Sequence, residues 1–128
     1  MSEPNWIEKA VVLAIHDAQV AEHGGEPGLR DDGLLDSALA RPRNLLAYGS
    51  PDVSRLAAAY AFGIAANHPF IDGNERTAFV VASTFLRLAG MKLTASPEER
   101  VVMFFRLAAG EIDEEAIADW FRINSAAI

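Results

Sequence analysis

The sequence predicts an all-α fold, a compact bundle of about six helices that forms one domain over residues 1–128. Apolar residues recur at the three- and four-residue spacing of an amphipathic helix almost throughout the chain. Glycine and proline residues divide this pattern into segments of ordinary helix length. No two apolar runs are joined by a hairpin-type turn, so a β-sheet is not expected.

The first two helices have clear stop signals. The first is expected over residues 5–23, because the Gly-Gly pair at 24–25 can adopt the backbone conformation that ends a helix. The second is short and begins after a side-chain cap at Asp31 or Asp32. It is expected to end at Pro42, because a proline disfavours helical geometry in the residue before it.

The next two helices flank the most polar stretch of the chain. A side-chain cap at Asp52 or Ser54 opens the third, an alanine-rich helix that continues to about residue 67. After a loop, the fourth helix is expected over residues 75–89, and it stops at Gly90.

The last two helices begin with strong capping signals. After a short extended link at residues 91–94, Ser96 caps the fifth helix and Pro97 takes its first position. That helix ends at Gly110. Asp113 opens the sixth, and the acidic residues that follow suit the positive end of the helix dipole.

Composition excludes several classes of function. The chain is 51% hydrophobic and 23% charged, which is typical of a globular domain, and it has no cysteine, which excludes disulfides and thiolate chemistry. Its net charge of −7 argues against binding to nucleic acid or to an anionic membrane, since both require a basic face. No signal peptide or membrane-spanning run is visible, so we expect a cytoplasmic protein.

Residues 68–76 concentrate reactive and ligand-binding side chains in a layout that suits a phosphate group. Gly73 lets the backbone bend tightly and approach a ligand closely. The following residues begin a helix, whose free N–H groups and dipole attract anions. Arg76 in its first turn adds a planar charged fork that matches phosphate oxygens.

Two further side chains of this segment suit group transfer. Asp72 offers one hard oxygen ligand, the usual number where Mg²⁺ is shared with the phosphates of a nucleotide. His68 is of the residue type that acts as a general base near neutral pH. A purely structural interpretation stays open from the residues alone: Asp72 and Glu75 could form a capping box that only starts the fourth helix, which would leave Arg76 in solvent.

The segment His-Pro-Phe-Ile-Asp-Gly-Asn-Glu-Arg closely resembles the Fic/Doc (filamentation and death-on-curing) signature, His-Pro-Phe-x-Asp/Glu-Gly-Asn-x-Arg, at every position that the signature fixes. Residues 24–42, 77–78 and 85–90 are similar to the death-on-curing branch, so the resemblance covers essentially the whole chain. It implies a Fic/Doc-like helical fold and a nucleotide-dependent transferase.

The resemblance implies a role for each matching residue of the segment. His68 would take the proton from a hydroxyl of a target protein, and Asp72 would hold the Mg²⁺ that bridges the phosphates. The backbone at Gly73 and Asn74 would bind a phosphate, with the Asn74 side chain touching a phosphate oxygen. Arg76 would neutralise charge during transfer. Phe70 would be a structural anchor in the core.

Two departures from the pattern bear on the reaction. AMP-transferring Fic enzymes usually carry a second arginine where this chain has Phe79, and glycine where it has Glu75. The death-on-curing branch usually has lysine at the latter position and resembles a kinase that transfers the terminal phosphate. We therefore predict phosphate transfer ahead of AMP transfer. Glu75 could repel a polyphosphate by about 1 to 4 kcal/mol, face solvent, or hold Mg²⁺.

The resemblance also implies cofactors and partners. Mg²⁺ and ATP, or another nucleoside triphosphate, would be used to modify a translation elongation factor and block translation, as a toxin does. A Phd-like antitoxin chain would bind the toxin, and a groove between the first helix and residues 55–67 is the expected docking place. A protein AMP-transferase and a degenerate Fic fold that serves as a binding or regulatory module are the alternatives.

Other charged and titratable residues receive ordinary interpretations. His16 and His23 lie seven residues apart, which is not a metal-binding spacing, and are expected to be polar or partly buried. Arg30, Arg41 and Arg43 are expected to be solvated at helix ends. A docking or phosphate-binding role for this basic stretch is the alternative.

Overall fold

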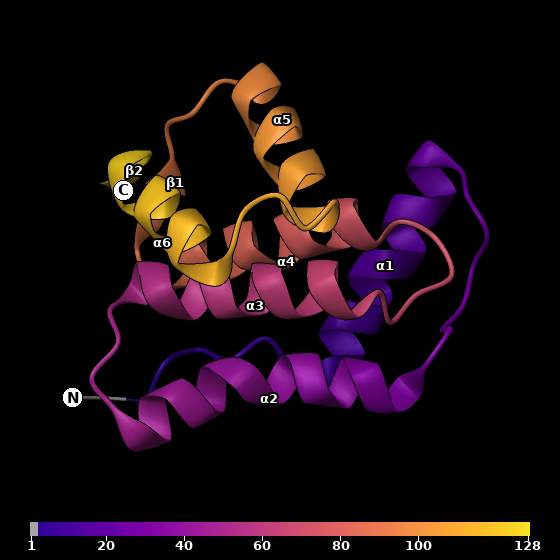
Figure 1. Ribbon diagram of the computed structural model, residues 1–128, viewed down its shortest axis with the longest axis horizontal. Helices are drawn as coiled ribbons and strands as arrows, with labels where there is room; N and C mark the ends of the chain where they lie inside the picture. The colour runs from indigo at the N-terminus through magenta and orange to yellow at the C-terminus, as the bar shows by residue number, and fades with distance from the viewer. Residues whose placement is uncertain (1–2) are drawn as a thin grey trace.

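The protein, a computed structural model whose described residues are 3–128, folds into six helices and one two-stranded sheet (Figure 1). The predicted all-α fold is confirmed. In chain order the elements are α1 (Lys9–His23), α2 (Asp32–Tyr48), α3 (Val53–Asn67), α4 (Asn74–Leu88), β1 (Met91–Leu93), α5 (Pro97–Ala108), α6 (Glu114–Ile123) and β2 (Ser125–Ala127). None of these helices is both long and apolar enough to cross a membrane.

Helix α3 is the centre of the fold. It runs between α2 on one side and α4, α5 and α6 on the other (Figure 1). Its small residues allow neighbouring backbones to come close: a Cβ atom added at Gly63 would lie only 3.1 Å from the Cα of Ala38 on α2. Because most of α3 is buried in this way, it exposes few apolar side chains, and the prediction of a docking groove between the first helix and residues 55–67 is wrong.

Four helices begin at the side-chain caps that the sequence indicates. In each case a side-chain oxygen accepts a hydrogen bond from a backbone N–H of the first turn, which satisfies a donor that the helix itself leaves open. The caps are Asp31 for α2, Asp52 for α3, Ser96 for α5 and Asp113 for α6.

Two predicted helix boundaries are wrong. Helix α1 begins at Lys9 because the preceding residues are extended, and there the N–H of Ile7 donates to the hydroxyl of Tyr60 (2.9 Å). Burial raises the pKa of that Tyr60 hydroxyl. Helix α2 does not stop at Pro42 but continues to Tyr48. Pro42 is buried inside the fold, so the packing of its ring offsets the one backbone hydrogen bond that it cannot donate.

The small sheet is a further correction, because no sheet was expected. The predicted extended link forms β1, which pairs antiparallel with β2 at the end of the chain, with Met91 opposite Ala127 and Leu93 opposite Ser125. The partner strand lies more than thirty residues downstream, so no local turn signals the pairing.

Candidate active site in the loop between α3 and α4

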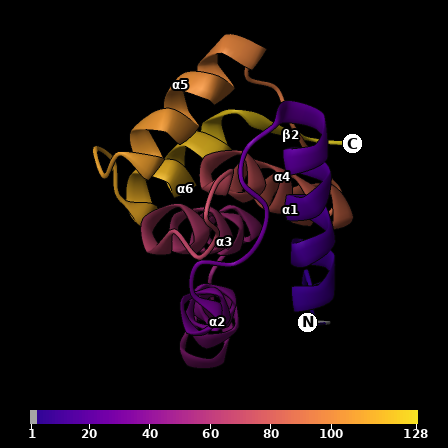
Figure 2. The ribbon, with the colours of Figure 1, turned by 90° about the vertical axis from the view of Figure 1, so that its right-hand side faces the viewer.

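The loop of residues 68–73 lies beside the segment of residues 24–31 that joins α1 to α2 (Figure 2). The two segments are joined by backbone hydrogen bonds: the N–H of Ile71 donates to Gly28 (3.2 Å) and the N–H of Arg30 donates to Pro69 (2.7 Å). This pairing fixes the path of the loop from one side.

His68 stands at the exposed start of the loop in a strained backbone conformation. It is the only non-glycine residue among residues 3–128 with a positive φ (48°), and it ends α3. The guanidinium of Arg30 holds this turn in place: its Nε donates to the carbonyl of His68 (2.7 Å) and its Nη2 to that of Asn67 (2.8 Å). Arg30 therefore positions His68 through the backbone.

Phe70 and His16 form the buried floor of the loop. Both side chains are about 1% exposed, and their rings stack with centroids 3.8 Å apart. Nε2 of His16 donates to the carbonyl of Asp72 (2.8 Å). Sequence reasoning missed this role of His16, because the contact joins residues 56 positions apart and no local pattern indicates it.

Asn74 closes the loop on itself. The N–H of Phe70 donates to Oδ1 of Asn74 (2.9 Å), and Nδ2 of Asn74 donates to the carbonyl of Phe70 (2.9 Å). The side chain expected to touch a phosphate is thus engaged in holding the loop. The backbone N–H of Asn74 remains available at the start of α4.

The start of α4 and Arg76 together offer donors to an anion. The first helical bond of α4 runs from the N–H of Thr77 to Gly73 (3.0 Å), so the N–H groups of residues 74–76 have no acceptor within residues 3–128. Arg76 is half-buried, its Nη2 donates to the carbonyl of Gly24 (3.2 Å), and its buried Nε has no partner in the part of the chain described. These donors line a hollow of about 320 Å³ that His68 and Asp72 also border.

The geometry rejects the capping-box interpretation. Gly73 takes the N-cap position of α4 with φ 75°, and no side chain caps this helix. The Asp72 carboxylate faces the other way, where its Oδ2 accepts from the N–H of Glu26 (2.9 Å). Gly25 makes room for it, since a Cβ there would lie 3.3 Å from the Cβ of Asp72.

One carboxylate oxygen is therefore left for a cation. Oδ1 of Asp72 has no hydrogen-bond partner among residues 3–128. Within the same residues no three acidic or histidine side chains cluster to form a complete metal cage. The donor set thus fits a Mg²⁺ ion that takes most of its ligands from phosphates and water.

Glu75 lies at the rim of the hollow, one position before Arg76. Its carboxylate makes no hydrogen bond or ion pair within the described chain.

His68 borders a second hollow as well. This hollow has a volume of about 600 Å³ and lies between the end of α3 and the connection from α5 to α6. His68 thus lies between the hollow at the start of α4 and this second hollow.

Comparison with known proteins identifies the family of this chain. The family model described as the Fic/DOC family matches residues 6–86, which contain the loop and most of the elements that hold it. The chain belongs to the Fic/DOC family.

Two relatives carry functional names. "Protein kinase doc" of Escherichia phage P1 is 35% identical over 112 residues, which cover 87% of this chain and 88% of the relative. "Toxin Doc" of Mycolicibacterium smegmatis is 48% identical over 75 residues, which cover 56% of this chain and 57% of the relative.

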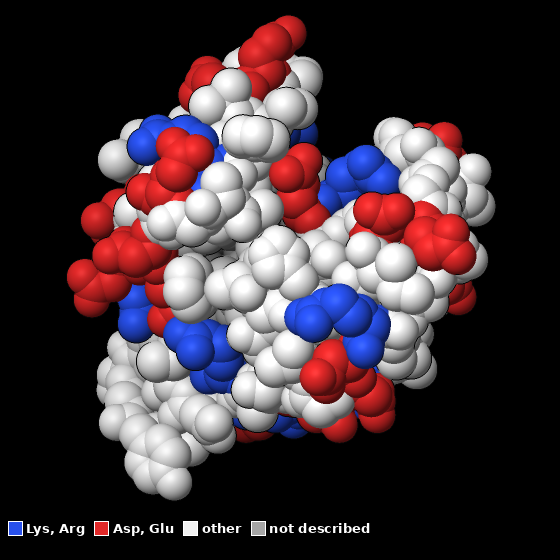
Figure 3. Space-filling model, turned by 45° about the vertical axis from the view of Figure 1, so that its right-hand side comes forward, with Lys and Arg blue, Asp and Glu red and all other residues white. Residues whose placement is uncertain are grey.

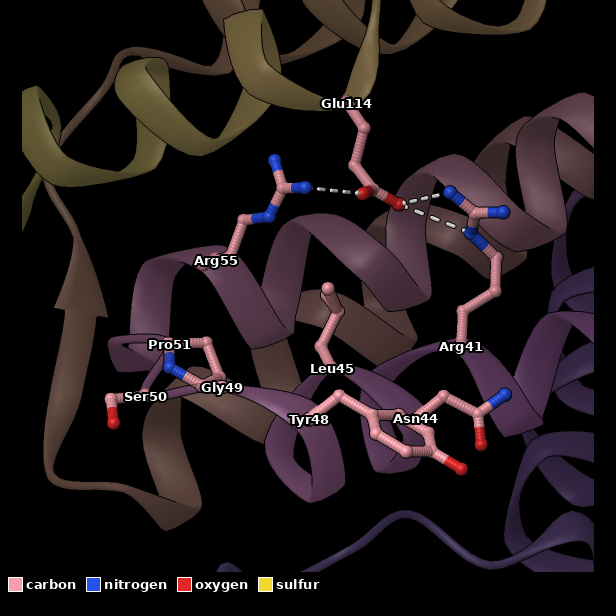
Figure 4. A pocket seen from close by; sticks show the side chains of 9 residues that line it. All are labelled: Arg41, Asn44, Leu45, Tyr48, Gly49, Ser50, Pro51, Arg55 and Glu114. Atoms are coloured by element: carbon pink, nitrogen blue, oxygen red, sulfur yellow. Dashed lines mark hydrogen bonds and ion pairs between the residues drawn. The ribbon is translucent and has the colours of Figure 1, made fainter.

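A separate pocket lies away from the Fic/DOC loop, between α2, α3 and the start of α6 (Figure 4). Its two arginines point at one carboxylate: Nη2 of Arg41 lies 2.7 Å from Oε1 of Glu114, and Nη2 of Arg55 lies 3.0 Å from Oε2. Arg43 likewise pairs with Glu8 (2.7 Å). The basic stretch of the sequence is therefore divided among separate internal contacts and adds no cation to the loop other than Arg30.

Proposed function

We propose that this chain is a Doc-type toxin that transfers the terminal phosphate of a Mg-nucleotide to a hydroxyl group of a protein. The relative named a protein kinase, which aligns over most of both chains, supports this activity. The relative named a toxin supports the biological role. The observation that carries the proposal is the loop itself, where an exposed histidine stands beside a set of open anion donors.

In the proposed reaction, His68 accepts the proton of the acceptor hydroxyl. The hydroxyl oxygen forms a bond to the terminal phosphorus, the bond from that phosphorus to the bridging oxygen breaks, and the nucleoside diphosphate leaves with the electron pair. Arg76 and the N–H groups at the start of α4 stabilise the charge on the phosphate oxygens. The acceptor protein would approach from the second hollow beside His68.

Asp72 would hold the metal in this scheme through its free carboxylate oxygen. A bound Mg²⁺ would neutralise part of the phosphate charge. The N–H of Glu26 holds the other oxygen of this carboxylate, and Gly25 leaves room for the side chain.

Phosphate transfer is favoured over AMP transfer by Phe79. A second arginine at this place would add a cation one turn after Arg76, whereas the ring of Phe79 packs on Phe104 with centroids 5.1 Å apart. Protein AMP-transfer is the alternative within the same enzyme class. A degenerate site kept for binding or regulation is the alternative outside it, and Glu75 is the residue that would cause the loss of activity.

Labelled ATP tests the proposal. The purified chain is incubated with a translation elongation factor, the target that we propose, and with ATP labelled in either the terminal or the innermost phosphate. We expect transfer of the terminal label only, its loss in His68→Ala, and its retention in Lys92→Ala, a change on the exposed side of β1. Transfer of the innermost label would establish AMP transfer. Undiminished growth inhibition by His68→Ala would favour the binding module.

We further propose that a separate antitoxin chain controls this activity. The exposed apolar side chains of α5 support a docking surface there, since Val101, Val102 and Phe105 are 67%, 55% and 60% exposed on one helix. An amphipathic helix with basic flanks would suit both this face and the net charge of −7.

A further inference from the structure

A cavity distinct from the second hollow beside His68 adjoins the phosphate-binding hollow on its other side. It has a volume of about 380 Å³, within the range of small-molecule sites, and it lies between the end of α1, the start of α4 and α5. Figure 3 shows that the molecule is hollowed on the side where α1 and α5 come forward. The residues of the cavity that matter here are Gln19, Glu75, Arg76, Phe79, Arg100 and Val101.

The cavity is continuous with the phosphate-binding hollow. Glu75 and Arg76 border both spaces. Of the two, His68 borders the hollow and not the cavity, whereas Phe79, one turn further along α4, borders the cavity and not the hollow. Along the surface the order is therefore His68, then Arg76, then Phe79. A molecule whose anionic end lies at the loop can extend its other end into the cavity.

The wall of the cavity suits a nucleobase. Phe79 is held by its edge contact with Phe104, and the guanidinium of Arg100 lies 5.9 Å from the Phe79 ring centre. Nε of Arg100 donates to the carbonyl of Ala95 (2.9 Å), which fixes that guanidinium. Aromatic rings and guanidinium planes are the surfaces on which bases stack. The Gln19 amide, which has no hydrogen-bond partner among residues 3–128, offers donors and an acceptor to a base edge.

We infer that this cavity is the nucleoside subsite, with the base against the wall of Phe79 and Arg100 and with the ribose hydroxyls donating to the carboxylate of Glu75. The inference rests on the proposed function and identifies where the non-phosphate part of its nucleotide binds. A carboxylate that accepts from ribose hydroxyls is a common recognition device. It gives a role to a residue that would otherwise only repel phosphate. The order of residues along the surface then leaves the terminal phosphate beside His68.

Calorimetry of the full chain with three magnesium-loaded probes tests the base contact. The probes are ATP, inorganic triphosphate and 2′,3′-dideoxy-ATP. We expect ATP to bind about tenfold or more tightly than triphosphate, in line with the worth of one stacked base. Val101→Trp fills the cavity from an exposed position and should reduce ATP affinity to that of triphosphate. Val102→Trp is the matched control on the exposed surface outside the cavity, and it should leave the affinities for ATP and for triphosphate unchanged.

The ribose contact is tested with Glu75. In the unaltered chain, dideoxy-ATP should bind about tenfold more weakly than ATP, because hydrogen bonds from the two hydroxyls to a charged acceptor are lost. In Glu75→Ala the two nucleotides should bind equally well.

The outcomes separate the inference from the function on which it rests. If none of the three probes binds, the proposed nucleotide-dependent function fails and the inference falls with it. If triphosphate and ATP bind equally tightly, or if the two tryptophan variants behave alike, the nucleoside subsite is refuted while the phosphate loop stands. Equal binding of ATP and dideoxy-ATP by the unaltered chain would refute the ribose contact at Glu75.

Discussion

The geometry of the reactive loop depends on side chains that hold its backbone. Arg30 donates hydrogen bonds to the carbonyls of Asn67 and His68, and His16 donates one to the carbonyl of Asp72. Each donor comes from a segment far from the loop in sequence. Three carbonyls of the loop are thereby fixed, which holds the backbone from which the imidazole of His68 projects.

Arg30 is therefore expected to act as a positioning residue. Arg30→Lys keeps the charge but cannot donate two hydrogen bonds from one rigid plane. We predict that kcat for phosphate transfer falls about tenfold to hundredfold, as expected for a displaced general base, while KM for the nucleotide changes little. The measurement is steady-state kinetics with labelled ATP.

A matched control is Arg43→Lys, because the guanidinium of Arg43 pairs with Glu8 on the surface and not with the loop. Its kinetic constants should equal those of the unaltered chain. If Arg30→Lys instead raised KM with kcat unchanged, Arg30 would act in nucleotide binding and the positioning role would be refuted.

At the scale of single residues, the sequence predicted the members of the loop but not all of their contacts. His68, Asp72 and Arg76 do border one hollow, since nine consecutive residues cannot separate far. The direction of each side chain was less predictable. Asn74 turns back to Phe70, and His16 arrives from another helix, because both contacts depend on how distant segments pack.

Helix ends are the elements that local sequence predicts best. A cap acts within three residues of itself, so Asp52 and Asp113 indicate the starts of α3 and α6 without any knowledge of the fold. The predicted start of the first helix and the predicted end of the second at Pro42 were wrong, because tertiary contacts decide where these two helices begin and end. Burial of Pro42 and the hydroxyl of Tyr60 outweigh the local signals there.

The cap of α3 also links two elements that are distant in sequence. Oδ1 of Asp52 accepts from the N–H of Arg55 (2.8 Å), while Oδ2 accepts from Nε of Arg122 at the end of α6 (2.7 Å). The hydrogen bond and charge of Arg122 hold the pKa of Asp52 below its usual value of 3.8. The pairing should therefore make stability depend on pH in a definite direction.

The pKa of Asp52 is lower in the folded than in the unfolded state. Its contribution to the free energy of unfolding is therefore complete above pH 3.8, the unfolded value, and is lost as the pH falls through the folded value. Asp52→Asn keeps a capping oxygen but removes the charge. We predict a loss of about 0.5–1 kcal/mol at pH 7, kept small because both partners are largely exposed, and a smaller loss at pH 3.5. Urea unfolding at the two pH values measures it.

Asp113→Asn is the control for this experiment. Asp113 caps α6 in the same way, through the N–H of Ala116 (2.8 Å), and it forms no ion pair within residues 3–128. Its substitution should cost less at pH 7. An equal loss in both variants would mean that the cap alone, and not the pair with Arg122, stabilises the junction of α3 and α6.

At the scale of the whole molecule, a net charge of −7 coexists with a local group of open hydrogen-bond donors in the loop. On the face in Figure 3, basic and acidic side chains are interspersed and do not form one basic surface. The open hydrogen-bond donors of the loop are backbone N–H groups and one arginine, so they contribute little to the net charge. Composition therefore bears on macromolecular partners and does not limit the chemistry of a small site.

Helix α5 gives the whole molecule an exposed apolar face, and the proposed antitoxin should bind there. Phe105→Glu places a charge in that face without disturbing the core, since the side chain is 60% exposed. We predict that antitoxin affinity falls at least tenfold, as for removal of an aromatic anchor, while growth inhibition by the toxin alone persists. Tyr48→Glu, at an equally large side chain 90% exposed on α2, should bind the antitoxin normally. Equal affinities of both variants and the unaltered chain, measured by calorimetry, would move the docking surface away from α5.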